Sequence, residues 1–249
     1  MEQLVEEARQ EALERARQRK LDRKKKPPFP KWLFWVIAIA MVLNVVSLLP
    51  QTLSIPVFDF LKTSAQLSLD DDIKAYKEAV VVVEDESSRG TGFAISSDGV
   101  IITNEHVVEN RDTVTVGFAK EGLFTAEVVE THPAVDLAVL KVDGENLPHL
   151  KLADELIFES DEHVTFIGNP LRFQRIVNEG EIIGYTSLKD WEEDVVMIKA
   201  PIYRGNSGSP IINSKGEVIG VVFATSQTDK YGKVGLFIPI DYFYKYTNN

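Results

Sequence analysis

The chain has 249 residues, 44% of them hydrophobic, so it is long enough for one or two packed cores. It contains no cysteine, which excludes disulfides, cysteine-based zinc sites and a thiol nucleophile. The net charge of −11 is unevenly divided: residues 1–31 hold ten Lys/Arg against six Asp/Glu, and the acidic remainder argues against nucleic acid as a partner, because phosphate contacts need clustered cations.

The N-terminal segment, residues 1–31, consists of strong helix formers interleaved with charges. This pattern predicts a solvated, charged helix whose basic end is also suited to contact anionic lipid.

The next segment, Trp32 to Leu49, carries no charge and has only Asn44 and Ser47 as polar residues. As a helix it would be about 27 Å long, close to the ~30 Å hydrocarbon thickness of a bilayer. A cleaved signal peptide would have a shorter apolar core and a small-residue cleavage site, and a buried core helix would rarely carry cations on one flank only. We therefore expect a transmembrane helix at 32–49. The positive-inside rule then gives a single-pass protein of the cell membrane, with a cytoplasmic N-terminus and the rest extracytoplasmic.

Residues 50–74 are interpreted as a linker or stalk, with a short helix possible at Ile73–Glu78. From Ala79 onward the pattern changes to short β-rich runs separated by turn formers such as Ser97-Asp98-Gly99. The runs are 80–83, 92–96, 100–104, 113–118, 126–130, 137–142, 163–168, 181–187, 195–200, 209–213, 217–224 and 234–240. Many short strands at regular spacing predict an all-β sandwich or a pair of barrels.

Ser207 lies between Gly205 and Gly208 in the stretch RGNSGSPIIN. A nucleophilic serine needs an imidazole base, a carboxylate that orients the base, and N–H donors for the oxyanion. The N–H groups of Gly205 and Ser207 are the candidate oxyanion hole. A nucleophile elbow of the G-x-S-x-G type would require a helix after the serine, whereas Pro210 and a β-run follow here.

His106 is the candidate base, since it follows an apolar strand at the start of a possible helical turn. The other histidines, His132, His149 and His163, have positions typical of surface or turn residues. Asp136 is the candidate acid, because a carboxylate in an apolar strand is costly unless it is hydrogen-bonded. Two alternatives remain. Asp136 only caps its own loop, or Lys199 forms a Ser–Lys dyad with Ser207, which would leave His106 and Asp136 unexplained.

The blocks GTGFAISSDGVIITNEHVV, THPAVDLAVLKV, IGNPL and RGNSGSPIINSKGEVIGVV resemble those of trypsin-like serine proteases of the HtrA/Deg family, from about Val80 to Pro239. The resemblance implies a chymotrypsin-like fold of two six-stranded β-barrels within residues 75–249, at about 75–152 and 153–245. It also implies His106, Asp136 and Ser207 as the triad and Gly205 as the oxyanion glycine. A homotrimer is compatible with the resemblance, but the oligomeric state is left undecided.

The chain departs from the family pattern at three positions near the site. Ser209 and Arg172 each replace a glycine, and Arg204 stands where the family has proline or arginine. Asn206 replaces the aspartate that a trypsin-type zymogen switch requires, so no activating cleavage is expected. After Asn249 there is no room for the PDZ domain usual in the family.

These features together predict a membrane-anchored serine endopeptidase that cuts exposed or unfolded extracytoplasmic protein segments and needs no cofactor or metal. Pro201 and Tyr203, in KAPIYRGNS, are expected to line the substrate pocket. Pro201 falls where enzymes of basic specificity carry an aspartate, so small or medium apolar side chains are expected there instead of Lys or Arg. The alternative is a non-catalytic peptide-binding or sensor module tethered to the membrane.

Overall fold

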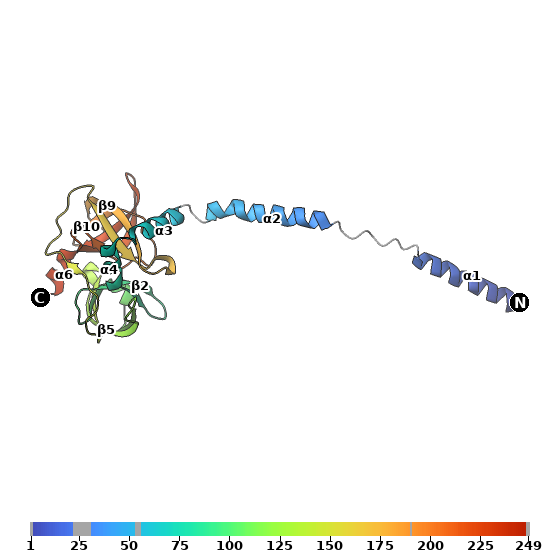
Figure 1. Cartoon of the computed structure of the whole chain (residues 1–249), viewed down its shortest axis with the longest axis horizontal. Helices are drawn as coiled ribbons and strands as arrows, with labels where there is room; N and C mark the ends of the chain where they lie inside the picture. The colour runs from blue at the N-terminus through green and yellow to red at the C-terminus, as the bar shows by residue number, and fades with distance from the viewer. Residues whose placement is uncertain (1, 22–30, 53–55, 190, 248–249) are drawn as a thin grey trace. The chain divides into compact units, whose positions relative to one another are not determined.

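The computed structural model describes residues 2–21, 31–52, 56–189 and 191–247, and the chain divides into two compact units, Met1–Ile55 and Pro56–Asn249. The first unit contains two helices, α1 (Glu2–Leu21) and α2 (Lys31–Thr52) (Figure 1). Helix α1 lies within the predicted charged segment 1–31, of which residues 22–30 are outside the described part of the chain.

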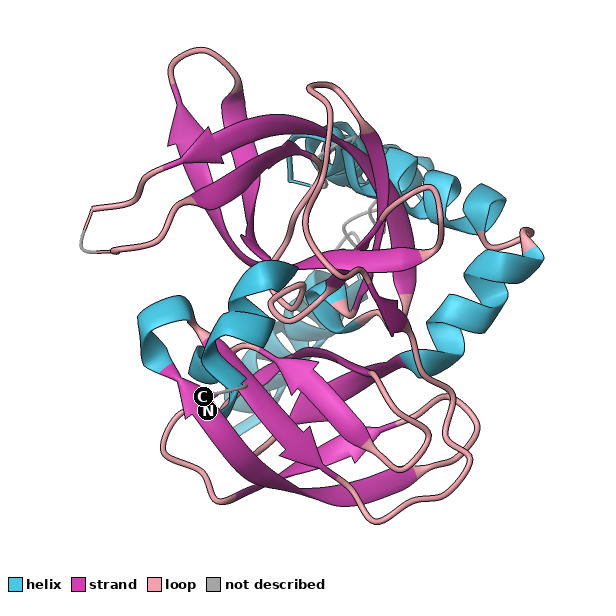
Figure 2. Cartoon of the chain, turned by 90° about the vertical axis from the view of Figure 1, so that its left-hand side faces the viewer, coloured by secondary structure: helices cyan, strands magenta, loops and turns pink. Residues whose placement is uncertain are grey.

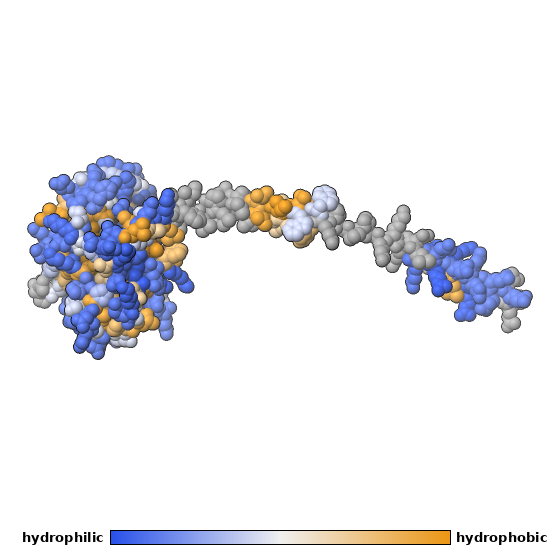
Figure 3. Space-filling view, viewed as in Figure 1, coloured by the Kyte–Doolittle hydropathy of each residue, from blue (hydrophilic) through white to orange (hydrophobic). Residues whose placement is uncertain are grey.

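Helix α2 includes the predicted membrane span, although its side chains are described only from Trp32 to Asn44. In the space-filling view α1 is largely hydrophilic, and the described part of α2 is largely apolar (Figure 3). Taken over the residues that the structure describes, none of the helices combines the length and the apolar character needed to cross a membrane. The span at 32–49 therefore stays a prediction.

The segment predicted as a linker or stalk, 50–74, differs from that expectation. It contains α3 (Pro56–Leu67) and the start of α4 (Asp71–Ala79), the latter capped by Asp70, whose carboxylate accepts from the backbone N–H groups of Asp72 and Ile73. Helix α3 belongs to the second unit: Phe60 is only 3% exposed, and the N–H of Val177 donates to Ser64 Oγ at 3.1 Å. Phe60, Leu61 and Leu67 have the spacing of one helical face, so the sequence does carry an amphipathic signal for this helix, which the interpretation as a linker did not use.

The strands gather into two groups (Figure 2). The first group is a closed β-barrel of six strands in the order β1-β2-β3-β6-β5-β4. Its strands are β1 (Val80–Glu84), β2 (Arg89–Ala94), β3 (Val100–Thr103), β4 (Thr113–Gly117), β5 (Leu123–His132) and β6 (Leu137–Lys141). Successive side chains of a strand point to opposite faces of the sheet, so one face of each strand points into the barrel. In β4, Val114 and Val116 are buried while Thr113 and Thr115 are exposed.

The second barrel has six strands in the order β11-β8-β9-β10-β13-β12, closed by the pairing of β11 with β12. A seventh strand, β7, pairs in parallel with Glu217 and Val218 at the start of β12. The strands are β7 (Lys151–Leu152), β8 (His163–Gly168), β9 (Ile176–Thr186), β10 (Val195–Lys199), β11 (Pro210–Ile212), β12 (Glu217–Thr228) and β13 (Gly232–Pro239). The prediction of two six-stranded barrels is confirmed. The boundary at about 152 stays a prediction; β7 lies at that position and pairs with β12 of the second barrel.

The last element of the described residues is α6 (Ile240–Thr247), a helix that the sequence analysis does not predict. Its Tyr242 hydroxyl donates to the carbonyl of Asp194, and its Tyr244 hydroxyl donates to that of Ala153. One hydrophobic core combines residues of both barrels, including Phe93 of β2 and Phe166 of β8, and so joins them. A separate core, including Ile101 and Leu140, fills the first barrel.

Candidate active site

His106 and Asp136 are brought together by the first barrel. Helix α5 (Glu105–Val108) is the single turn predicted after β3, and it carries His106. The Nδ1 atom of His106 lies 2.7 Å from Asp136 Oδ2, and the backbone N–H of His106 donates to Asp136 Oδ1 at 2.9 Å. One carboxylate thus fixes both the ring and the backbone of the same histidine.

Asp136 itself is placed by an unusual backbone conformation rather than by a strand. It follows the 3₁₀ turn Pro133–Val135 and precedes β6, with a left-handed φ of 48°. The expectation that it lies within the strand is therefore corrected, since an extended backbone would not turn the carboxylate toward α5. Its carbonyl accepts from Asn104 Nδ2 at 2.8 Å, which secures the turn to β3.

The electrostatic setting favours a protonated imidazole. The pKa of His106 is raised, chiefly because its ring is hydrogen-bonded to Asp136, while partial burial acts in the opposite direction. The neighbouring Glu105 also has a raised pKa, because of burial and the negative charge of Asp136. The other three histidines are separate from this pair: His132 contacts Glu130, His149 contacts the Leu147 carbonyl, and His163 lies near Glu181.

Ser207 lies close to this pair in space but is not hydrogen-bonded to it. A Cβ added to Gly90 would lie 2.8 Å from a methyl of Val107, the neighbour of His106, and 3.1 Å from the carbonyl oxygen of Ser207. The turn of Ser207 and helix α5 therefore flank the same point of β2. The Ser207 hydroxyl donates to the Phe223 carbonyl at 3.4 Å, a long hydrogen bond.

The N–H groups of Gly205 and Ser207 have no intramolecular acceptor within the described part of the chain. The Arg204 carbonyl accepts from the N–H of Leu171 at 3.0 Å, and the Asn206 carbonyl accepts from the N–H of Ser209 at 2.9 Å. Because a trans peptide points its carbonyl and its N–H in opposite directions, the N–H of Gly205 points away from Leu171 and the N–H of Ser207 points away from Ser209. Two unpaired donors separated by one residue form a site that can receive an oxyanion.

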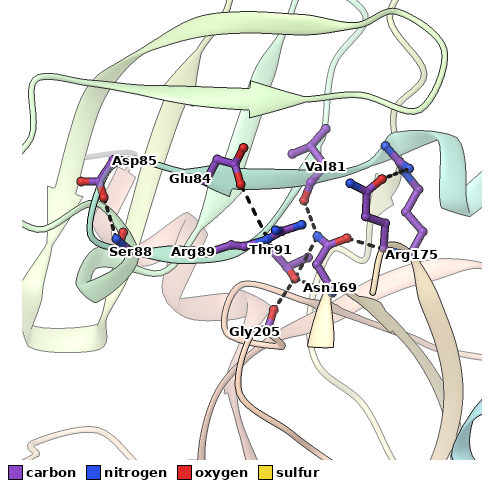
Figure 4. A network of polar contacts seen from close by, with 10 residues as sticks. Val81, Glu84, Asp85, Ser88, Arg89, Thr91, Asn169, Arg175 and Gly205 are labelled. Carbon is purple, nitrogen blue, oxygen red and sulfur yellow. Dashed lines mark hydrogen bonds and ion pairs between the residues drawn. The ribbon is translucent and has the colours of Figure 1, made fainter. Parts of the chain in front are cut away.

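Thr91 of the first barrel holds this turn from the other side. Its N–H donates to the Ser207 carbonyl at 2.8 Å, and its hydroxyl donates to the Gly205 carbonyl at 2.7 Å. Figure 4 shows the continuation of this network, with Asn169 between Thr91 and the Val81 carbonyl. The sequence reading missed Thr91 and Asn169, since their partners lie far away in the chain.

Both glycines of the turn are required by space as well as by conformation. Gly205 has a φ of 100° and Gly208 a φ of 85°. A Cβ on Gly208 would lie 1.8 Å from the Thr91 carbonyl oxygen, and one on Gly205 would lie 2.5 Å from that of Asn169. Neither contact is possible for a real side chain, so the turn and the neighbouring backbone fit only with glycine at these positions.

The substituted family positions have different consequences. Arg172 adopts a φ of 72°, next to Leu171 with 51°, so it occupies a backbone conformation suited to the glycine that it replaces. Ser209 is fully buried, and its hydroxyl has no hydrogen-bond partner among the described residues, as is also true of the side-chain amide of Asn206. Arg204 is exposed, and its carbonyl bond to Leu171 leaves the Gly205 N–H free.

A pocket of about 340 Å³ opens beside Ser207. Tyr203 lines it as predicted, but Pro201 does not, and the remaining wall comes mainly from β12. The backbone turns at Pro201, where the N–H of Ile202 donates to the Ala200 carbonyl. Within the described residues there is no cluster of three metal-ligating side chains.

The two barrels and this arrangement define a chymotrypsin-like peptidase domain. The family model for the trypsin-like peptidase domain matches residues 90–221, and the chain belongs to that family.

The chain is similar to proteins named probable periplasmic serine endoprotease DegP-like. It is 41% identical over 160 residues to that of Pseudomonas putida (strain F1), covering 62% of this chain and 33% of the relative. It is 37% identical over 158 residues to that of Chlamydia trachomatis, covering 62% and 32%. The chain thus spans about a third of the length of the curated relatives it matches.

Two solved structures are similar over the same region. Rv3671c from M. tuberculosis H37Rv, crystallised as an inactive form of a serine-to-alanine mutant, aligns with a TM-score of 0.63 and 29% identity, covering 72% of this chain and 89% of that one. The serine endoprotease from Yersinia pestis aligns with a TM-score of 0.61 and 27% identity, covering 71% and 64%.

Proposed function

We propose that the protein is a serine endopeptidase in which His106, Asp136 and Ser207 form the catalytic triad. The observation that carries this proposal is the double contact of Asp136 with the ring and the backbone N–H of His106, beside a serine whose turn has two free N–H donors. A solvated surface histidine has no need of such an arrangement.

The reaction is an acyl transfer. Asp136 accepts from Nδ1–H of His106 and so leaves Nε2 free to take the proton of the Ser207 hydroxyl. The oxygen of Ser207 attacks the peptide carbonyl, and the N–H groups of Gly205 and Ser207 bind the oxyanion that forms. His106 then gives its proton to the leaving amine, and a water hydrolyses the acyl-enzyme by the same route.

The Ser207 hydroxyl must leave the Phe223 carbonyl before it reaches His106. A rotation about χ1 moves it between staggered positions, and the 3.4 Å bond that is lost is weak. Catalytic hydrogen bonds are commonly long or misaligned without substrate and shorten when it binds. The resting position of this hydroxyl is also what a non-catalytic peptide-binding module would have, which makes that module the second candidate.

The substrates are exposed protein segments outside the cytoplasm, and an anchor at 32–49 holds the domain at the membrane. The name of the relatives as periplasmic endoproteases supports the compartment, and the apolar segment behind a basic cluster supports the anchor. Extraction of membranes with alkaline carbonate tests the anchor: the full chain should stay in the pellet, and release into the supernatant would contradict it.

Labelling by a fluorophosphonate probe tests the catalytic role. The full chain should be labelled at Ser207, Ser207→Ala should not be labelled, and the control Ser187→Ala should be labelled like the parent, because Ser187 only contacts Asp194 on the surface. Labelling that survives Ser207→Ala contradicts the proposed nucleophile. A parent chain that binds peptides but takes no label supports the binding module instead.

A further inference from the structure

The pocket beside Ser207 is the place for the substrate side chain on the acyl side of the cleaved bond. Ser207 itself is part of its wall, so a residue whose carbonyl carbon meets the serine must direct its side chain there. The walls are apolar where Ile202, Val222, Phe223 and Ala224 line them.

The polar part of the same pocket is cationic. Arg204 and Lys233 line it together with the hydroxyl-bearing Thr225, and no Asp or Glu contributes to its wall. Neither cation has an ion-pair partner or a side-chain hydrogen bond within the described residues; Lys233 Nζ lies 5.8 Å from the centre of the Tyr203 ring. The described wall of this pocket therefore contains two cations and no carboxylate. Arg204 also lines an adjoining pocket that contains Glu84, Asp85 and Glu86, so Lys233 is the cation particular to the pocket beside Ser207.

Lys233 is held at this place by a well-defined hairpin. It is the second residue of β13 and pairs with Gln227 of β12. The hairpin end is secured by the hydroxyl of Thr228, which donates to the Gly232 carbonyl at 3.2 Å and accepts from the N–H of Tyr231 at 3.0 Å. The cation is thus presented by a strand rather than by a loose loop.

Tyr203, the ring beneath Lys233, is also held. The ring of Phe60 in α3 packs against it edge-on, with 5.0 Å between the ring centres. The buried Phe60 fixes one side of the pocket, and Lys233 closes toward the same ring. The ring under the cation is therefore held by packing, while the Lys233 side chain itself is exposed.

We propose that this pocket selects an acidic side chain, Glu or Asp, on the acyl side of the cleaved bond, with Lys233 as the main determinant. The inference rests on the proposed endopeptidase function. The methylenes of a glutamate fit along the apolar wall, and its carboxylate reaches the cation. This differs from the apolar preference expected from the sequence, because Lys233 lies far along the chain from KAPIYRGNS and only the hairpin brings it to the pocket.

The test compares peptides that differ only at the acyl-side residue, with Glu, Gln, Val, Ala and Lys. Gln has the shape of Glu without its charge, so the ratio of kcat/KM for the two peptides isolates the electrostatic contribution. For an exposed ion pair we expect Glu to exceed Gln by roughly two- to fivefold. Glu should also exceed Val and Ala, and Lys should be the poorest.

Three variants of the full chain sharpen this comparison. Lys233→Met should bring the Glu/Gln ratio to about one, and Lys233→Glu should make the Lys peptide better than the Glu peptide. Lys230→Met is the matched control: it removes a lysine of the same hairpin that contacts Tyr231 but does not line the pocket. Its ratio should equal that of the parent chain.

The outcomes separate the two proposals. Fluorophosphonate labelling of each variant establishes that its site is formed. Three results in a parent chain that is labelled would overturn the acidic preference and leave the endopeptidase intact. They are a Glu/Gln ratio near one, a preference for Val or Ala over Glu, and a Glu/Gln ratio that Lys233→Met leaves unchanged. Absence of both labelling and cleavage in the parent overturns the endopeptidase and the preference with it.

Discussion

Replacing Asp136 by Asn probes the candidate site at its most constrained point. The carboxylate accepts two hydrogen bonds, from His106 Nδ1 at 2.7 Å and from the His106 N–H at 2.9 Å. An asparagine has only one acceptor atom. If that atom keeps the bond to the backbone N–H, its NH₂ group faces Nδ1 and requires an unprotonated Nδ1. The proton of the neutral ring then moves to Nε2, where His106 can no longer act as a base.

The magnitude follows from this tautomer. Without a base the serine keeps only the contributions of the oxyanion donors and of substrate binding, and the corresponding change in trypsin costs about 10⁴ in kcat. We expect a loss of similar size here, with a KM within a few-fold of the parent value, because Asp136 touches no substrate. Steady-state hydrolysis of a peptide substrate measures both constants.

Glu130→Gln is the matched control for this variant. Glu130 is a carboxylate that also contacts a histidine, His132, at 3.3 Å, but on the surface. It should leave kcat unchanged. A kcat for Asp136→Asn within tenfold of the parent, in a variant that still melts cooperatively, would refute the role given to Asp136.

Four further predictions concern pH and stability. The acidic limb of the kcat/KM profile should have its midpoint above pH 6.5, because Asp136 raises the pKa of His106 and the base must be neutral; a midpoint at or below 6.5 would contradict this. The same raised pKa of His106 stabilises the fold below pH 6.5, and this stabilisation is lost as pH rises through the folded-state pKa. The free energy of unfolding, measured by chemical denaturation, should therefore differ most between the parent and His106→Ala at acidic pH. Arg172→Gly should stabilise the domain by about 1 kcal/mol through relief of the left-handed backbone, and a lower melting temperature would contradict that reading. Phe60→Ala should destabilise it by about 3–5 kcal/mol, whereas an unchanged melting temperature would make α3 a mere linker.

Much of the fold could be predicted because its strands carry local signals. Runs of alternating or continuous apolar residues bounded by turn formers marked all twelve barrel strands, and the glycines around Ser207 marked the sharp turn. The elements that were missed depend on tertiary contacts. Strand β7 has two residues and exists only by pairing with β12, and α3 is held by contacts with β9.

In the candidate site, too, some residues could be predicted from local signals and others depend on tertiary contacts. The residue types and their order indicated His106, Asp136 and Ser207, but the left-handed turn that orients Asp136 has no local signature in an apolar run. Thr91 was invisible because its partners, Gly205 and Ser207, are more than a hundred positions away. Lys233 was missed for a similar reason, since an exposed lysine on a hairpin is ordinary until the pocket wall is known.

The central claim is that a single serine attacks while one histidine takes its proton and two backbone N–H groups receive the charge. A crystal structure of the full chain with a peptide boronate measures this arrangement directly. The account predicts a bond from Ser207 Oγ to boron, one boronate oxygen within hydrogen-bond distance of the N–H groups of Gly205 and Ser207, and the Nε2 atom of His106 within reach of the adduct. A boronate that leaves Ser207 unmodified, or whose oxygens meet neither N–H, would contradict it.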